Sequence, residues 1–289
     1  MTRITALFLL ASGGAIAADA CRRDSDCRRG NICVANQCVA SREQSAAQDA
    51  GMALVYTKNT WPLSIVDRPL VVAPGMTEVQ LGVNKDVSAD IGGFIISHPL
   101  TADLSARYGV SDRIHAGLDV NSFCLSDCGP NFQFLSVGAG YAVVADHDAN
   151  LVPSVTVGVF NVPGGALVTL NPGFLGAWRA ARSLQIFASG GFILGVIGRD
   201  NTSNPDYFNF HLEPRIEIVP RFSIAPYIGY LLPLKNTDVY SIPVGVNLLV
   251  IADRAFDIGG SFEFSDIGAK LFPNATDYRS FRVFVTFRL

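Results

Sequence analysis

The sequence contains no hydrophobic run of about 18 residues, the length that a transmembrane helix requires. The best candidate, residues 184–198, is shorter and is interrupted by glycines. Charged residues are scarce, at 16% of the chain, although 49% of the 289 residues are hydrophobic. The net charge of −3 and the lack of a basic patch predict no nucleic-acid partner. High hydrophobicity without helical spans is typical of β-strands dispersed in a bilayer.

The common catalytic signatures are also missing. There is no GxSxG motif, no HExxH motif and no phosphate-binding glycine loop in the sequence. Glycines occur mostly inside strand-like segments, where they relieve crowding or bend a sheet. We therefore expect no enzymatic activity and no cofactor.

The clearest positive signal is the alternation over Tyr207–Leu232. From Phe208 to Ile218 the even-numbered residues are apolar, and the odd-numbered residues from Asn209 to Glu217 are polar or charged. The alternation resumes after Pro220-Arg221, which predicts a hairpin of two strands with about a dozen residues each. Such length and an uncharged apolar face are typical of transmembrane strands, which need about 9–11 tilted residues.

Similar alternating segments occur along most of the remaining chain. They cover residues 77–83, 100–109, 114–121, 132–144, 151–160, 166–178, 184–196, 240–251, 255–264 and 279–289. With the hairpin, they predict an all-β fold: a transmembrane antiparallel up-and-down β-barrel of about 12 strands over residues 76–289. Bacterial single-chain barrels have an even number of strands.

The connections between these segments alternate in length. Short turns are predicted at 110–113, 145–149, 180–183, 220–221 and 252–254. Mostly longer polar loops lie between them, at 84–99, 122–131, 199–206 and 265–278. Barrels of the outer membrane have short periplasmic turns and longer external loops, so both ends of the predicted barrel are expected in the periplasm. A soluble secreted β-sandwich, the other reading of the strands, leaves this alternation unexplained.

The lysines of the barrel region agree with this arrangement. Lys85, Lys235 and Lys270 all fall in predicted external loops, and none is predicted to face lipid, where a charge at mid-membrane would cost about 2–4 kcal/mol.

The last strand resembles the terminal signal that the outer-membrane assembly machinery recognises. In RSFRVFVTFRL the apolar residues are Phe281, Val283, Val285, Phe287 and Leu289, with Leu289 in place of the usual terminal Phe. The segment RYGVSDRI at 107–114 similarly resembles a strand–turn–strand unit of proteobacterial outer-membrane barrels of the porin or transporter type. The resemblance implies an outer-membrane location, with the assembly machinery and outer-membrane lipid as partners.

Three segments precede the predicted barrel. Residues 1–17 have the composition of a secretory signal peptide, with Arg3, an apolar centre and a small-residue cleavage site. Residues 18–40 form a cysteine-rich segment, and residues 41–75 are predicted to be a linker, a periplasmic extension or a plug.

The cysteines of an exported chain predict disulfides. Four are clustered within residues 18–40: Cys21, Cys27, Cys33 and Cys38. They predict two disulfides with three alternative pairings, and a zinc site is disfavoured because no CxxC pair or nearby histidine is present. The spacing, with its acidic residues and Gly30, resembles Dickkopf N-terminal or EGF-like modules, which implies an interaction or stability module. Cys124 and Cys128 are predicted to close an external loop, without a metal.

The predicted inward face carries charged residues on several strands. They are Asp103, Arg107, His115, Asp119, His211, Glu213, Arg215, Glu217, Asp257 and Glu263. Outer-membrane lipases use a lipid-facing Ser, His and Asn, but here His115 and His211 face the lumen. The charged lining is either a permeation pathway with a constriction or a salt-bridge network that stiffens a narrow barrel. Two functions follow: porin-like passage of a small solute, or a closed barrel that anchors the cysteine-rich module.

Overall fold

The computed structural model describes residues 31–34, 37–40, 56–88, 99–126, 134–162, 165–219, 221–238, 240–264, 267 and 278–289. The chain divides into two compact units, Met1–Ser45 and Ala46–Leu289. In the first unit, β1 (Asn31–Val34) and β2 (Gln37–Ala40) pair antiparallel, with Cys33 opposite Cys38. The predicted signal peptide, Cys21 and Cys27 lie outside the described residues.

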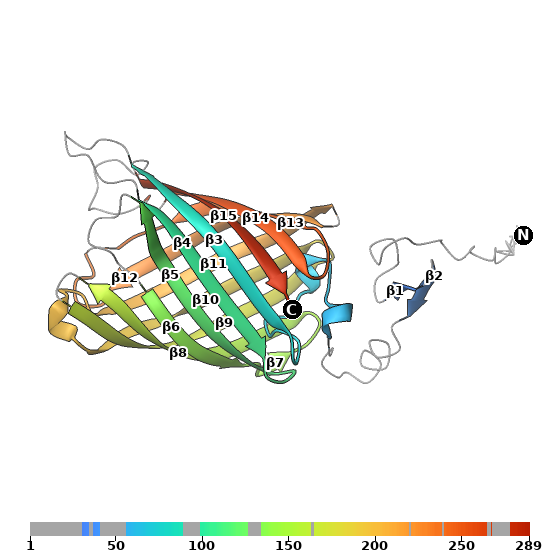
Figure 1. Cartoon of the computed structure of the whole chain (residues 1–289), viewed down its shortest axis with the longest axis horizontal. Helices are drawn as coiled ribbons and strands as arrows, with labels where there is room; N and C mark the ends of the chain where they lie inside the picture. The colour runs from blue at the N-terminus through green and yellow to red at the C-terminus, as the bar shows by residue number, and fades with distance from the viewer. Residues whose placement is uncertain are drawn as a thin grey trace, which may run out of the picture. The chain divides into compact units, whose positions relative to one another are not determined.

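The second unit is a closed antiparallel barrel, seen from the side in Figure 1. The strands that cross it are β3 (Thr77–Ser88), β4 (Leu100–Gly109), β5 (Ile114–Ser126), β6 (Phe134–Tyr141), β8 (Ala149–Val162), β9 (Gly165–Ala181), β10 (Leu184–Ile197), β11 (Asp206–Val219), β12 (Phe222–Pro233), β13 (Val244–Ile251), β14 (Phe256–Phe264) and β15 (Tyr278–Arg288). The short β7 (Val144–Ala145) pairs with the beginning of β8. Each strand pairs with the next one, and β15 pairs with β3 to close the ring. The predicted barrel of about 12 strands is confirmed.

The hairpin of β11 and β12 has the register that the alternation predicts. Phe208 lies opposite Leu232, and Ile216 lies opposite Ile224, so the apolar residues of both strands share one face. His211 lies opposite Gly229 on the other face. Arg221, in the turn, has a positive φ of 76°, a conformation that a tight hairpin turn demands and that costs a non-glycine residue some strain.

The two ends of the barrel differ in their connections. At one end, which we call the turn end, only short segments join the strands, and both Thr77 and Leu289 lie there, joined by backbone hydrogen bonds of 3.1 and 2.8 Å. At the opposite end, the loop end, lie the longer connections 89–99, 127–133, 198–205, 234–243 and 265–277. One loop-end connection is short, because only residues 163–164 separate β8 from β9.

Two predicted loops are shorter than expected because strands extend into them. β3 continues through Asn84 to Ser88, and β5 continues to Ser126 past a bulge at Ser122, whose φ is 58°. The placement of Lys85 in an external loop was therefore wrong: Lys85 lies in β3, opposite Leu100 and Phe281, on the outward face.

The outward face of the barrel is an apolar surface. Half-exposed side chains such as Leu81, Val137, Val157, Ile258 and Val283 cover it, with fractional exposures of 43–63%. Such exposure is too extensive for a water-facing sheet and is typical of a face that contacts lipid. No helix among the described residues has the length and hydropathy that a membrane span needs.

Candidate functional site

The inside of the barrel is the candidate site. By strand alternation and register, the structure places all ten predicted lining residues on the inward face: Asp103, Arg107, His115, Asp119, His211, Glu213, Arg215, Glu217, Asp257 and Glu263. They do not form one ring but fall into clusters at different heights along the barrel.

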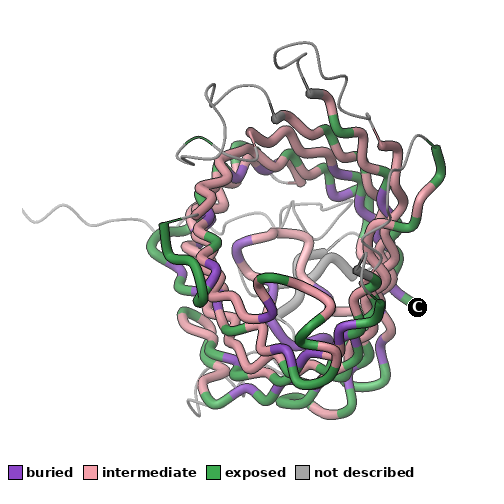
Figure 2. Tube along the Cα trace, turned by 90° about the vertical axis from the view of Figure 1, so that its left-hand side faces the viewer, coloured by how far each residue is buried: buried purple, intermediate pink, exposed green. Residues whose placement is uncertain are grey.

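A chain segment before β3 occupies the turn end of the lumen. Residues Tyr56–Met76, which we call the inner segment, include the 3₁₀ turns η2 (Lys58–Thr60) and η3 (Ile65–Asp67). Looking along the barrel, Figure 2 shows chain inside the ring of strands. The segment buries two apolar clusters: one of Tyr56, Trp61, Val72, Ala73 and Met76, and one in which Leu70 and Val71 pack on Ala142, Val152 and Ala177 of the wall.

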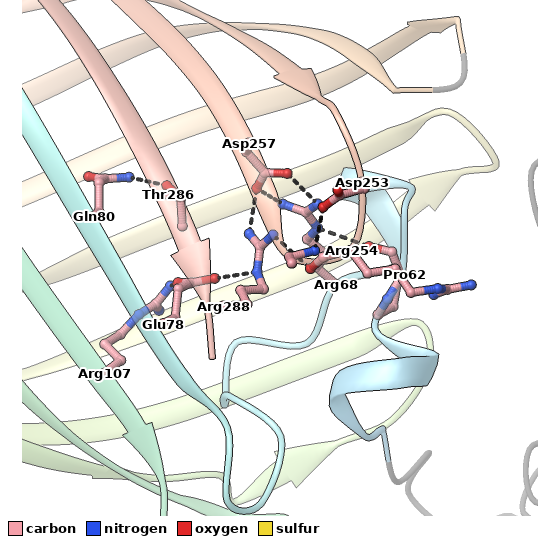
Figure 3. Close-up of polar contacts among 11 residues, drawn as sticks. Pro62, Arg68, Glu78, Gln80, Arg107, Asp253, Arg254, Asp257, Thr286 and Arg288 are labelled. Carbon is pink, nitrogen blue, oxygen red and sulfur yellow. Dashed lines mark hydrogen bonds and ion pairs between the residues drawn. The ribbon is translucent and has the colours of Figure 1, made fainter.

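Arg68 of the inner segment is fully embedded in a network of charges (Figure 3). Its guanidinium donates two hydrogen bonds to Asp257 of β14, of 2.6 and 3.0 Å. Asp257 also pairs with Arg288 of β15, which donates from Nε to Glu78 of β3 at 2.8 Å. Glu78 in turn pairs with Arg107 of β4. Burial lowers the pKa of Arg68, and the paired carboxylate of Asp257 opposes that shift.

The inner segment is held to the other side of the barrel as well. Asp67 pairs with Arg179 of β9, and Gln185 of β10 donates to the carbonyl of Val66 at 3.3 Å. β9 and β14 are separated by β10–β13 on one side of the ring and by β15 and β3–β8 on the other. Consecutive residues Asp67 and Arg68 therefore attach the inner segment to opposite walls.

A second cluster lies above the inner segment, around Glu213 of β11. Arg215 donates from Nε to Glu213 at 2.6 Å, Asn247 donates to its other oxygen, and His211 lies 3.6 Å away. Arg215 also donates to Gln185 at 3.2 Å and lies over the ring of Phe187, 4.1 Å from its centroid. Gln185 thus links this cluster to the inner segment.

A third cluster lies across β3, β4 and β15. Asp103 accepts hydrogen bonds from Asn84 and, at 3.0 Å, from the backbone of Ser122, and it lies 3.5 Å from Arg282. Arg282 also donates to Gln80 at 3.0 Å. On the neighbouring part of the wall, Tyr227 of β12 donates to Glu263 of β14 at 2.7 Å. Acidic and basic side chains therefore alternate along the lumen instead of forming a surface of one sign.

Glycines make room for aromatic side chains in this lumen. A Cβ at Gly259 would lie 2.1 Å from the ring of Phe284, and a Cβ at Gly245 would lie 2.5 Å from the ring of Tyr227. Both rings therefore pack directly against a glycine of the wall, where any larger residue would displace them.

Three of the predicted lining residues, His115, Asp119 and Glu217, lie outside these three clusters. His115 is buried beside Gly140, Asp119 accepts from Ser136 at 3.4 Å, and the backbone N–H of Glu217 donates to Ser183 at 2.9 Å near the turn end. No group of His, Cys, Asp and Glu among the described residues is arranged to hold a metal ion.

Several members of the network were missed from the sequence. Glu78 and Arg288 occupy polar positions of alternating strands and could have been included by that pattern. Arg68 lies outside any periodic segment, so no sequence signal indicated that its charge would be buried.

The structure describes most of the residues that were predicted to form a disulfide in an external loop or the assembly signal, but not all of them. Cys124 is disulfide-bonded, while Cys128 lies outside the described residues. Of the residues predicted as an assembly signal, Phe281, Val283, Val285 and Phe287 belong to β15 and face outward, and Leu289 follows the strand.

An uncharged outer belt around a charged lumen is the architecture of outer-membrane β-barrels. Solved structures show the same fold. The NanC porin matches with a TM-score of 0.54 and 13% identity over 72% of this chain and 100% of its own. The KdgM porin in complex with disordered oligogalacturonate matches with a TM-score of 0.50 and 10% identity, over 72% and 98% of the two chains. No family model and no curated protein matches this chain.

Proposed function

We propose that the protein is an outer-membrane β-barrel that passes a small polar solute through its lumen. The observation that carries the proposal is the contrast between the two faces of the strands. Outward positions are apolar, whereas inward positions carry Glu213, Arg215, Asp103 and Arg282 in polar clusters. Charged side chains that line a channel favour water and set the selectivity of passage. The similarity to porin structures supports this reading at the level of the fold.

In this proposal the turn end faces the periplasm. Short turns are periplasmic in outer-membrane barrels, and the chain enters and leaves the barrel at that end. The cysteine-rich segment 18–40 would then lie in the periplasm, and β15 would present the signal to the assembly machinery.

In this proposal the inner segment restricts the route at the turn end. It joins β9 to β14 at the turn end, so a solute that enters from the loop end meets it after passing Glu213 and Arg215. Mixed charge along this path favours small polar solutes over long polymers whose charges all have one sign. The solute therefore has to pass beside the inner segment or wait for it to move.

Single-channel recording in a planar bilayer tests the proposal. The protein is refolded first, and a shift in gel mobility on heating verifies that the barrel has formed. Steady conductance that changes in Arg215→Gln supports passage through the lumen. A folded barrel without conductance refutes passage of ions and small hydrophilic solutes.

The second candidate is a closed barrel that anchors the cysteine-rich segment without transport. It is favoured by the inner segment itself, because buried ion pairs to both walls and two apolar clusters can seal the turn end. A folded, non-conducting protein that stays non-conducting when the inner segment is detached from one wall would count against passage and favour this candidate instead.

A further inference from the structure

A histidine lies beside the ion pair that attaches the inner segment to β9. This residue, His147, belongs to the turn between β7 and β8 at the turn end. Its ring contacts the guanidinium of Arg179, which pairs with Asp67 and whose side chain is only 4% exposed. The backbone N–H of Arg179 donates to the carbonyl of Asp148 at 2.8 Å, which fixes the turn next to β9. A charge on His147 therefore acts directly on the attachment of the inner segment.

The contacts of the two ring nitrogens of His147 fit a neutral imidazole. Nδ1 lies 2.8 Å from a carboxylate oxygen of Asp148, which can only accept, so Nδ1 carries a proton. Nε2 lies against Nη1 of Arg179, which can only donate, so Nε2 is the acceptor. A proton on Nε2 would remove this hydrogen bond and place two positive charges in contact.

Water can reach this histidine. Its side chain is 30% exposed and lines a cavity of about 540 Å³ at the turn end, between the inner segment and the turn. The other titratable groups that line the cavity or contact the ring are Tyr56, Asp67, Asp112, Asp146 and Asp148. The four carboxylates attract a charged imidazole, whereas Arg179 repels it. A protonated ring is therefore better paired with carboxylates than with Arg179.

We propose that His147 makes the attachment of the inner segment to β9 sensitive to pH. At neutral pH the imidazole accepts from Arg179 and holds its guanidinium next to Asp67. Histidine side chains gain a proton as the pH falls through the range of about 8 to 5. The charged ring then repels Arg179, and the ion pair between Arg179 and Asp67 weakens. Acid therefore loosens the inner segment on the β9 side.

The apolar contacts next to this ion pair loosen with it. Leu70 and Val71 follow Asp67 closely in the chain and are buried against Ala142, Val152 and Ala177 of the wall. The contact between Arg68 and Asp257 lies on the other wall and remains. The loosening itself does not depend on transport, whereas its effect on conductance rests on the passage of a solute proposed above.

Hydrogen–deuterium exchange of the backbone amides of residues 65–76 tests the proposal without recording conductance. The unchanged protein is compared with His147→Gln, whose amide oxygen can still accept from Arg179 but gains no charge. Both are measured at about pH 8 and at about pH 5.5, on either side of the histidine range. Because the two proteins are compared at the same pH, the intrinsic pH dependence of exchange cancels. The amides of β12 are the internal reference.

The expected result is equal exchange of the two proteins at the higher pH. At the lower pH, exchange in residues 65–76 should be about threefold or more faster in the unchanged protein, because local opening is easier there. In a background with Asp67→Asn and Arg179→Gln, the further change His147→Gln should have no effect at either pH. Equal exchange at the lower pH overturns the proposal, as does a difference that persists in this background.

Gel mobility before and after heating shows that the barrel of each variant is intact. Single-channel recording of the same samples reports on passage separately. Conductance that rises at the lower pH in the unchanged protein, and not in His147→Gln, connects the loosening of the inner segment to the route. Absence of conductance at both pH values would refute passage, while the exchange measurement still decides the role of His147.

Discussion

Asp67 and Arg68 are consecutive residues that pair with opposite walls of the barrel, Asp67 with Arg179 on β9 and Arg68 with Asp257 on β14. Their opposite charges match the charges that the two walls present. The inner segment is therefore attached at both sides by one dipeptide. Detaching either side should alter the shape of the lumen more than it alters the pairing of the strands.

Detaching the β9 side should increase conductance. The double variant Asp67→Asn and Arg179→Gln removes both charges, so that no buried charge is left unpaired. We expect a folded barrel with larger single-channel conductance, because the inner segment loses its ion pair to β9 and keeps its ion pair between Arg68 and Asp257 on the other wall. The control is Asp112→Asn with Arg113→Gln, in the exposed turn between β4 and β5. Unchanged conductance in the test variant would show that the segment does not restrict the route.

Asp257→Asn should strongly destabilise the turn end. The carboxylate of Asp257 compensates the charges of both Arg68 and Arg288, and removing one member of a buried ion pair costs about 3–5 kcal/mol. The urea midpoint of unfolding, followed by gel mobility, measures the effect. Asp253→Asn is the control, since the exposed Asp253 accepts only a local hydrogen bond from Ala255 at 2.7 Å and should cost about 1 kcal/mol or less. Similar midpoints for both variants would contradict a structural role of the network.

Glu213→Gln should shift ion selectivity toward anions. The substitution keeps the shape of the side chain but leaves the positive charge of Arg215 without its carboxylate partner in the lumen. The reversal potential across a potassium chloride gradient measures the shift. Asp112→Asn, outside the lumen, should leave the reversal potential unchanged. An identical potential for Glu213→Gln would place the route away from β11.

Gly109→Ala should loosen the inner segment. A Cβ at Gly109 would lie 2.1 Å from the carbonyl oxygen of Ala73, so the segment has to move away from β4. We expect faster labelling of a Val72→Cys reporter by a thiol reagent, because Val72 is otherwise buried at 2% exposure.

Gly117→Ala is the matched control for this reporter. A Cβ at Gly117 meets its nearest atom at 3.8 Å, which is ordinary van der Waals contact. Labelling of Val72→Cys should not change in that background. Equal labelling rates in both backgrounds would show that Ala73 and Gly109 do not hold the segment in place.

The alternation of residues predicted the strands well because one face of each strand contacts an apolar environment over its whole length. The hairpin of β11 and β12 is the best example, since its register follows directly from Phe208 to Ile218. Strand ends were less predictable. Asn84 and Lys85 resemble loop residues by composition, but pairing with Arg282 and Phe281 of β15 keeps them in β3.

The inner segment could not be predicted in the same way. Its sequence has no regular period, and its position depends on Asp257, Arg288 and Arg179, which are more than a hundred residues away in the chain. The individual charges of the lining were visible in the sequence, but their partners depend on which strands become neighbours when the ring closes.

The pairing of β3 with β15 brings the first and the last strand of the barrel together. Arg288, the last residue of β15, contacts Glu78 of the first barrel strand and shares Asp257 with Arg68. The seam and the anchoring of the inner segment at β14 thus share Asp257, whose carboxylate pairs with both Arg288 and Arg68. Closure of the ring by β15 therefore completes the set of charges around Arg68, whereas Asp67 can reach Arg179 of β9 independently of that strand.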